Sequence, residues 1–168
     1  GPGTVVSNLR VFQQGTYGIS LTNGSSNRVI RCVVYSNGTH GIHQTAPTTN
    51  NLFINNVSWR NVGDGIAIEG GRFAVVKNNI AESNGGDGIR DAVAAVGTTV
   101  EYNISFGQFP NNWTPVGLAT GTGNLTTDAA VVNPTATNFK LTGPCPASPA
   151  AEAGTTNGLM RYDGTAVV

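Results

Sequence analysis

The sequence predicts an all-β protein built as a solenoid of about five coils. Composition and internal repetition carry this prediction. Only 11% of the residues are charged, and the 23 Gly, 20 Thr and 19 Asn among 168 residues favour turns and strands over helix. An all-helical protein is therefore excluded, and the period of the repeat indicates the architecture.

The repeat is visible in two separate columns of residues. A Gly-Ile pair returns after 23, 24 and 23 residues, at Gly18-Ile19, Gly41-Ile42, Gly65-Ile66 and Gly88-Ile89. A second column returns after 24, 24, 23 and 24 residues, at Asn8, Cys32, Asn56, Asn79 and Asn103. Because two independent columns keep one period, each copy is expected to form one coil of the solenoid.

Each coil is expected to contain short strands. Alternations such as Ile66-Ala67-Ile68 and Val57-Ser58-Trp59 lack the long 3.6-residue period that a helical repeat needs. Gly and Asn separate them, as in Asn37-Gly38, and these residues tolerate the left-handed backbone of tight corners. Strands of successive coils then stack in parallel about 4.8 Å apart, and the recurring Ile and Val side chains point into a narrow continuous core.

The second column predicts an asparagine ladder. Stacked amides hydrogen-bond one another, so Asn56, Asn79 and Asn103 are expected to be buried and connected. Cys32 occupies the same column, where a buried thiol acts as a small apolar filler. A disulfide between Cys32 and Cys145 stays open as the alternative, and their spacing matches no zinc motif.

The solenoid is expected to span residues 4–106, followed by a loop and C-terminal cap over residues 107–168 that packs on it. The period is lost from Gly107, and Pro110 and Pro115 indicate a loop. A cap would cover the unpaired strand edges and core side chains at that end. The first coil begins by Val5 without such a device, which leaves open end-to-end self-association or an additional N-terminal domain.

The charge balance excludes several classes of partner. Nine basic and nine acidic residues give a formal net charge of zero, so no field attracts a polyanion, and no nucleic acid partner is expected. The longest apolar runs are a handful of residues, far below the roughly 18 that cross a bilayer, so no membrane span is expected either.

Candidate functional residues fall in two columns beside the Gly-Ile repeat. Stacking turns a 23-residue spacing into contact, which places the carboxylates of Asp64 and Asp87 about 5 Å apart, with His40 one coil further on. The first column lies directly before each glycine, at Tyr17, His40, Asp64 and Asp87. The second lies just beyond the inward Ile, at Ser20, His43, Ala67 and Arg90.

These columns allow a functional and a structural interpretation. In the functional one, His40, His43, Asp64, Asp87 and Arg90 form a polysaccharide site on the side of the solenoid. The Asp pair acts there as acid and base or as Ca²⁺ ligands, His acts as base, and Arg90 holds a substrate carboxylate. In the structural one, each Asp before Gly only accepts hydrogen bonds from corner N–H groups. Apart from Ca²⁺ at Asp64 and Asp87, no cofactor is expected.

The N-N-x-x-x-x-N and G-D-G-I elements of the coils resemble the right-handed parallel β-helix repeats of the pectate-lyase-like superfamily. The resemblance covers roughly residues 4–106. A second resemblance lies in the tail, where Phe139-Lys140-Leu141, residues 148–154 and Asp163-Gly164 look like the closing segment of secreted bacterial β-helix proteins, with Glu152 where those usually have Asp. The polygalacturonase-like elements N-T-D, Asp-Asp, G-H-G and R-I-K are not intact, so the resemblance does not extend to these particular enzymes.

Aromatic residues are a further sugar-binding signal. Trp59 shares a column with Val11, Tyr35, Glu82 and Phe106 and is expected to pack in the core. Trp113 and Phe109 follow the last coil, where packing of the tail over the end of the core competes with ligand binding.

The sequence therefore predicts an extracellular or cell-surface β-helix protein that binds a polysaccharide on its lateral face. Lyase, epimerase and glycoside hydrolase activities all stay open. The competing hypothesis is a non-catalytic structural or assembly module that stacks end-on with another domain or another copy.

Overall fold

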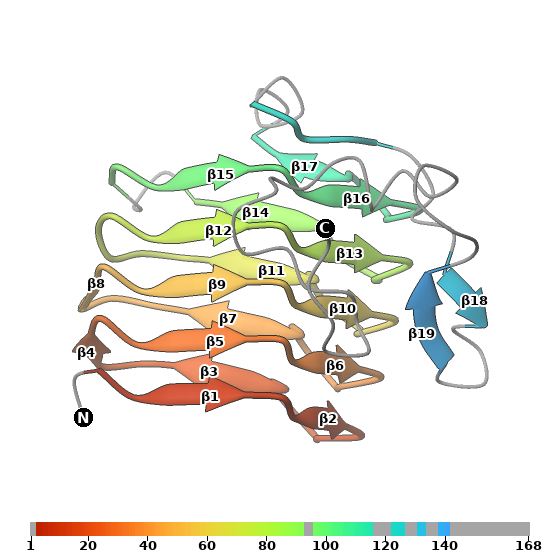
Figure 1. Cartoon of the computed structure of the whole chain (residues 1–168), viewed down its shortest axis with the longest axis horizontal. Helices are drawn as coiled ribbons and strands as arrows, with labels where there is room; N and C mark the ends of the chain where they lie inside the picture. Colours follow the sequence, from red (N-terminus) through yellow and green to blue (C-terminus); the bar gives the residue numbers. More distant parts are fainter. Residues whose placement is uncertain (1–2, 93–95, 116–121, 127–130, 134–137, 142–168) are drawn as a thin grey trace.

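The computed structural model describes residues 3–92, 96–115, 122–126, 131–133 and 138–141. Most of its strands form parallel sheets that wind into a solenoid (Figure 1). Each of three five-stranded sheets takes one strand from every coil. Sheet A contains β1 (Val5–Ser7), β5 (Arg28–Ile30), β9 (Leu52–Ile54), β12 (Val75–Lys77) and β15 (Thr99–Glu101). Sheet B contains β2 (Arg10–Phe12), β6 (Val33–Tyr35), β10 (Val57–Trp59), β13 (Ile80–Glu82) and β16 (Ile104–Phe106). Sheet C contains β3 (Ile19–Leu21), β7 (Ile42–Gln44), β11 (Ile66–Ile68), β14 (Ile89–Asp91) and β17 (Trp113–Thr114).

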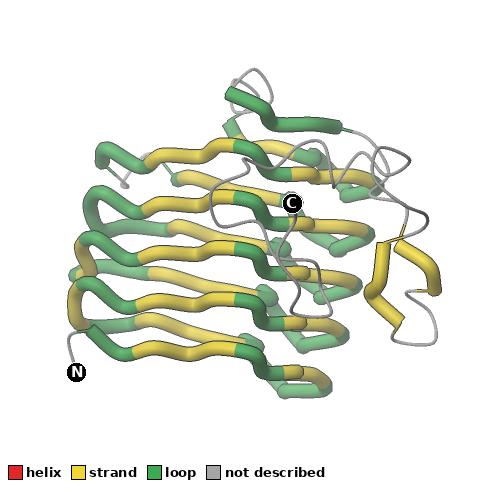
Figure 2. Tube along the Cα trace, viewed as in Figure 1, coloured by secondary structure: helices red, strands yellow, loops and turns green. Residues whose placement is uncertain are grey.

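The strand register confirms the predicted stacking. Ile66 pairs with Ile42 on one side and with Ile89 on the other, so the Gly-Ile repeat becomes one column of sheet C. The five strands of each sheet agree closely with the expected number of coils. Within the described ranges strands alternate with loops and no helix occurs, so none is available to cross a membrane (Figure 2).

Residues with a left-handed backbone conformation form corners of each coil. The residue after each strand of sheet B has a positive φ in every coil, as at Ser36 (54°), Arg60 (48°) and Ser83 (54°). The residue after each strand of sheet A does the same, as at Asn55 (58°) and Asn78 (56°). A single residue in this conformation turns the chain sharply. Only two residues therefore separate each strand of sheet A from the following strand of sheet B.

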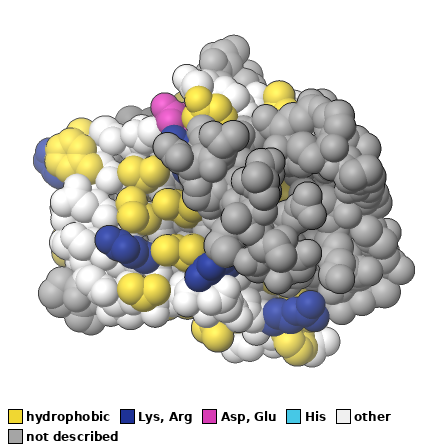
Figure 3. Space-filling model, in the orientation of Figure 1, with side chains coloured by type: hydrophobic (Ala, Val, Ile, Leu, Met, Phe, Trp, Pro, Cys, Tyr) yellow, Lys and Arg dark blue, Asp and Glu magenta, His cyan; other side chains and the backbone are white. Residues whose placement is uncertain are grey.

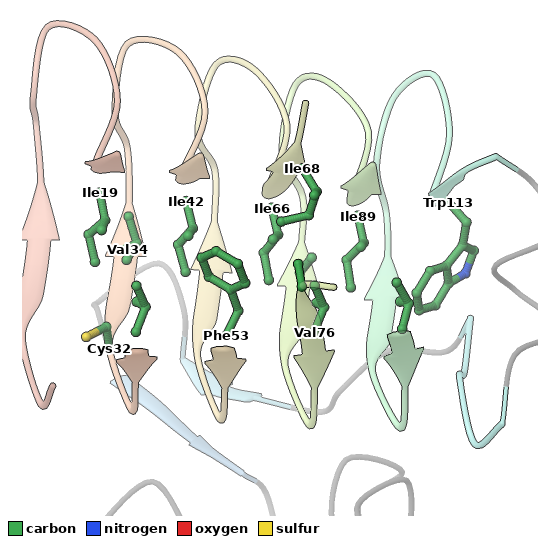
Figure 4. Packing of buried hydrophobic residues seen from close by; sticks show 14 residues of the cluster. Ile19, Cys32, Val34, Ile42, Phe53, Ile66, Ile68, Val76, Ile89 and Trp113 are labelled. Atoms are coloured by element: carbon green, nitrogen blue, oxygen red, sulfur yellow. The ribbon is translucent and has the colours of Figure 1, made fainter. Parts of the chain in front are cut away.

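The middle residue of each strand in sheets A and B points into the core, where it meets the isoleucine column of sheet C. Figure 4 shows Ile19, Ile42, Ile66, Ile89 and Trp113 in one row. Phe53 and Val76 from sheet A are fully buried opposite that row. The coils therefore share one continuous hydrophobic core.

The asparagine ladder is confirmed. The side chain of Asn56 donates to Oδ1 of Asn79 at 3.0 Å, and that of Asn79 donates to Oδ1 of Asn103 at 3.0 Å. The ladder continues to Oδ1 of Asn124, at 2.9 Å from the backbone nitrogen of Asn103. Leu9 rather than Asn8 occupies the first position, because the Val33 N–H donates to the Leu9 carbonyl and Asn8 takes the left-handed corner.

A second ladder, not predicted, lies one corner further along each coil. The side chain of Asn37 donates to Oδ1 of Asn61, and that of Asn61 donates to Oδ1 of Asn84, both at 2.9 Å. The backbone nitrogen of Asn84 donates to Oε1 of Gln108 at 2.7 Å. These bonds satisfy the corner backbone between sheets B and C, directly before the candidate site.

Cys32 is a free, fully buried thiol that contacts the central core, as expected of an apolar filler. Burial raises its pKa, while hydrogen bonds to backbone groups act weakly in the opposite direction. Cys145, its alternative disulfide partner, lies outside the described residues.

Both tryptophans are buried, and the expected burial of Trp59 is confirmed at 5% exposure, but neither tryptophan occupies the position that the sequence predicts. Trp59 pairs with Tyr35 and Glu82, whereas Val11 pairs with the inward Val34, so Trp59 is one position away from the core column. It packs with Val33, Tyr35 and Val57 in a separate cluster, which alternation places on the outer face of sheet B. Trp113 takes the isoleucine position in the last strand of sheet C and is 3% exposed. Phe109, the other aromatic residue after the last predicted coil, is 78% exposed.

Stacking continues beyond residue 106. β17 pairs with β14, and Leu125 forms a bridge with Ile104. Further along, β18 (Val131–Asn133) and β19 (Asn138–Leu141) form an antiparallel pair. Residues 148–154 and Asp163-Gly164, which carry the predicted closing segment, lie outside the described residues. Most of the expected cap, residues 107–168, also lies outside the described residues.

Candidate functional site

The column before the glycines stacks in the expected register. The N–H of Gly41 donates to the carbonyl of Asp64 at 2.9 Å, and the N–H of Gly65 donates to the carbonyl of Asp87 at 2.8 Å. The N–H of Gly18 donates to the carbonyl of His40 at 3.1 Å, which places Tyr17 next in the column. Tyr17, His40, Asp64 and Asp87 therefore occupy equivalent positions in successive coils.

Glycine is required directly after this column because the corner lies against the second asparagine ladder. A Cβ atom at Gly41 would overlap the hydroxyl of Ser58 and approach the amide of Asn61. Ser58 itself donates to the carbonyl of Gly65 at 2.7 Å. Each corner is thus held close to sheet B, which fixes the direction in which the next strand begins.

The second column lies on the outer face of sheet C. Ser20 pairs with His43, His43 with Ala67, and Ala67 with Arg90. Their neighbours Ile42 and Ile66 point into the core, so alternation turns this column outward. In Figure 1 sheet C lies behind sheet A, and the face in Figure 3 shows hydrophobic side chains and Lys or Arg but no histidine.

The two columns meet in an ion-pair network centred on Arg90. Its Nε donates to Oδ2 of Asp64 at 2.5 Å, and its Nη2 donates to Oε1 of Glu69. Nε2 of His43 lies 2.8 Å from Oε2 of Glu69. Oδ2 of Asp64 also lies 3.3 Å from Nδ1 of His40. Four of the five predicted residues, His40, His43, Asp64 and Arg90, are therefore joined in one cluster.

Glu69 is the functional candidate that the sequence prediction missed. It lies one residue beyond β11, and its side chain bonds to both Arg90 and His43. Alternation along Ile66-Ala67-Ile68-Glu69 gave a signal, because it places Glu69 on the same face as Ala67. The absence of Glu from equivalent positions in the other coils concealed it.

Burial lowers the pKa of His40 below its ordinary value of 6.5. The carboxylates of Asp64 and Glu69 oppose this effect, and Arg90 and His43 reinforce it. Nδ1 of His40 accepts a hydrogen bond from the backbone N–H of Asp64 at 2.8 Å. His40 is therefore a neutral imidazole at pH 7, with its proton on Nε2.

The acidic and basic members of the network stabilise each other's charges. Burial alone would raise the pKa of Glu69, but hydrogen bonds from His43 and Arg90 and the charge of Arg90 lower it overall. Burial alone would lower the pKa of Arg90, but the bonds to Asp64 and Glu69 raise it overall. Both groups are therefore ionised at neutral pH.

An aromatic ring covers this network. Tyr17 stacks on His43 with ring centroids 4.3 Å apart and an interplanar angle of 8°, and on His40 with centroids 5.7 Å apart. Tyr17 is 37% exposed, whereas the side chain of His43 is only 5% exposed. One aromatic surface thus faces outward directly above the two histidines.

Asp87 lies at the edge of the network. Its backbone N–H donates to Oδ1 of Asp64 at 2.8 Å, and its own Oδ1 accepts a bond from Asn111 at 3.2 Å. The bond from the Asp87 N–H to Asp64 is the corner hydrogen bond that the structural interpretation of the aspartates anticipates, whereas the donor to Asp87 is a side-chain amide.

The residues present do not fit a Ca²⁺ site at Asp64 and Asp87. Both oxygens of Asp64 already accept hydrogen bonds, one of them from the positive charge of Arg90. Ca²⁺ requires six to eight oxygen ligands. In the described part of the chain, no group of three or more His, Cys, Asp or Glu side chains is arranged to hold a metal ion.

Comparison with known proteins identifies the family. The model of the right-handed β-helix region matches residues 1–128, which is most of the chain. Neither the curated proteins nor the solved structures contain a match. The matched segment includes the stacked coils and the whole ion-pair network. The chain therefore belongs to the right-handed β-helix family, and the pectate-lyase-like resemblance is consistent with this assignment.

Proposed function

We propose that the protein binds a polysaccharide along the outer face of sheet C. The observation that carries the proposal is the exposed ring of Tyr17 stacked on His43 at 4.3 Å, beside the partly exposed side chains of Arg90 and Glu69. Aromatic faces pack against the C–H faces of sugar rings, while neighbouring polar groups bond the hydroxyls. An extracellular or cell-surface location is part of this proposal.

The stacked columns suit an extended ligand. Tyr17 lies in the first coil, and Phe109, which is 78% exposed, lies near the equivalent corner of the fifth. Four steps of about 4.8 Å separate these coils, a distance of about 19 Å that a short run of sugars can span. His40 and Arg90 lie between the two ends of this path.

The charges of the site favour a neutral polysaccharide. Asp64, Glu69 and Asp87 supply three carboxyl groups, Arg90 supplies one cation, and His40 is neutral at pH 7. Nε and Nη2 of Arg90 are already engaged by Asp64 and Glu69, so clamping a substrate carboxylate would break an existing ion pair. Uronate ligands would meet net negative charge. Lyase and epimerase chemistry on uronates therefore gains no support from the site.

Affinity gel electrophoresis tests the proposal with galactomannan and xylan as neutral ligands and polygalacturonate as the anionic one. Retardation by at least one neutral polysaccharide is expected, and Tyr17→Ala should remove it. Phe12→Ala is the matched control, because Phe12 is 43% exposed and also stacks on an aromatic ring, but on sheet B. Equal mobility of the wild type with and without each polysaccharide would contradict the proposal.

The assembly hypothesis also rests on a specific observation. Val5, Leu9 and Phe12 of the first coil are 57%, 49% and 43% exposed, and apolar strand edges favour end-on stacking. Under this hypothesis, light scattering should show mass that grows with protein concentration, and Val5→Lys should abolish the growth. A strictly monomeric wild type would exclude assembly.

A further inference from the structure

A hydroxyl, an imidazole and a carboxylate lie in a row on the outer face of sheet C. Oγ of Ser20 lies 3.2 Å from Nδ1 of His43, and Nε2 of His43 lies 2.8 Å from Oε2 of Glu69. The three residues come from three successive coils. We propose that Ser20, His43 and Glu69 form a nucleophilic triad that hydrolyses acyl esters.

The hydrogen-bond directions fit these roles. An ionised carboxylate only accepts hydrogen bonds, so the proton of a neutral His43 lies on Nε2, toward Glu69. Nδ1 then presents its lone pair to the hydroxyl of Ser20, as a general base must. Relative to the serine proteases the two ring nitrogens exchange roles, but the order of nucleophile, base and orienting acid is the same.

Burial is distributed as a nucleophilic site requires. Ser20 is exposed, whereas the side chain of the base His43 is 5% exposed. Tyr17 covers one face of the imidazole, and Arg90 holds the other oxygen of the Glu69 carboxylate. Tyr17 and Arg90 are therefore positioning residues, which fix the ring plane and the acid.

The edge of sheet C supplies a donor for the developing oxyanion. Alternate N–H groups of a strand point to opposite edges. The N–H of Ile19 donates across to Gly41 of the neighbouring coil, so the N–H of Ser20 points the other way. β3 is the terminal strand of sheet C within the described ranges. That N–H can bond the carbonyl oxygen of an ester held at Ser20.

The proposed reaction has two balanced steps. Oγ of Ser20 attacks the ester carbonyl carbon while His43 Nδ1 takes the hydroxyl proton, and the C–O bond to the alcohol breaks as His43 returns that proton to the departing oxygen. Water then attacks the acyl-serine, giving its proton to His43, and the carboxylic acid leaves as the proton returns to Oγ.

The substrate class follows from the neutral polysaccharide site and rests on that proposed function. An ester-substituted neutral polysaccharide, such as acetylated xylan, would lie along sheet C and present an acyl group to Ser20. The triad chemistry itself does not depend on polysaccharide binding, so it can be tested with a small probe.

Labelling with a fluorophosphonate, followed by mass spectrometry, tests the triad in the full chain. One phosphonyl group is expected on Ser20 in the wild type and in the control Ser7→Ala, and none in Ser20→Ala. Ser7 is a half-buried serine of the same coil without a histidine partner. Hydrolysis of p-nitrophenyl acetate should fall at least about 10²-fold in both Ser20→Ala and His43→Gln.

Folding and the two proposals can be separated. Because Ser20 is exposed, Ser20→Ala should keep the wild-type melting temperature. An unlabelled Ser20 in folded protein, or equal ester hydrolysis by Ser20→Ala and wild type, would overturn the triad. A labelled Ser20 without gel retardation by any polysaccharide would remove the proposed binding function and leave the triad. Retardation without labelling would do the reverse.

Discussion

Replacing Asn79 with alanine should strongly destabilise the solenoid. The Asn79 side chain accepts bonds from the backbone nitrogen and side-chain amide of Asn56, at 2.9 and 3.0 Å. It also donates to the carbonyl of Phe53 at 2.8 Å and to Oδ1 of Asn103 at 3.0 Å. Alanine would leave the two Asn56 groups and the Phe53 carbonyl without this partner in a place where Asn79 is only 1% exposed, whereas Oδ1 of Asn103 would keep its bond from the Asn79 backbone nitrogen.

The expected loss of unfolding free energy is about 3 kcal/mol, from about 1 kcal/mol for each unsatisfied buried group. This is the low end of the range, because a water molecule entering the vacated space restores part of the bonding. For a chain of this size the melting temperature should fall by roughly 6 to 12 °C.

Urea denaturation of Asn79→Ala and Asn111→Ala, followed by circular dichroism, measures this difference. Asn111 is the control, because it is exposed and its side chain makes one bond of 3.2 Å, to Asp87. Its replacement should cost no more than about 0.5 kcal/mol. Equal losses in the two variants would refute the argument that ladder amides stabilise the coils through buried bonds.

Three further predictions follow from the site and the core. Burial lowers the pKa of His40, so the unfolded chain binds a proton on this ring more readily than the folded chain does. The melting temperature of the wild type should therefore fall on acidification from pH 7.5 to 5.5. The fall should be smaller in His40→Gln, and an equal fall in the two proteins would contradict the burial argument. Trp113→Ala should lower the free energy of unfolding by about 3 to 5 kcal/mol and Phe109→Ala should leave it almost unchanged, because the two residues are 3% and 78% exposed. Equal urea midpoints for the two variants would show that Trp113 is not part of the core. Millimolar Ca²⁺ should leave the melting temperature unchanged, because the Asp64 carboxylate already forms an ion pair with Arg90. A Ca²⁺-dependent rise in melting temperature that is lost in Asp64→Asn would show a metal site.

Periodicity predicted the fold because stacking preserves sequence spacing. Asn79, Ile66 and Asp64 each fall where the 23- or 24-residue step places them. The second ladder at Asn37, Asn61 and Asn84 has the same period and was missed, although its spacing was equally visible. Trp59 was assigned to the inner face of its strand because Val11 was aligned with it one residue out of register. A one-residue slip in a strand exchanges the two faces of the sheet.

The candidate site was predictable only as far as its residues lie in columns. His40, His43, Asp64 and Arg90 come together because their positions repeat. Glu69 does not repeat, so no column indicated it, and it is the residue that connects Arg90 to His43. The direction of the Arg90 side chain, toward the two carboxylates that flank β11 in the preceding coil, depends on packing that spacing does not encode.

Proton–nitrogen NMR of the imidazole rings tests the lateral binding site most directly, because the only two histidines of the chain, His40 and His43, both lie in it. In the free protein at pH 7, His40 should show a neutral ring with its proton on Nε2. Addition of galactomannan or xylan oligosaccharides should then shift both ring spectra saturably, and Tyr17→Ala should abolish the shifts. Ring spectra that stay unchanged while the oligosaccharide binds would place the ligand elsewhere and contradict the account.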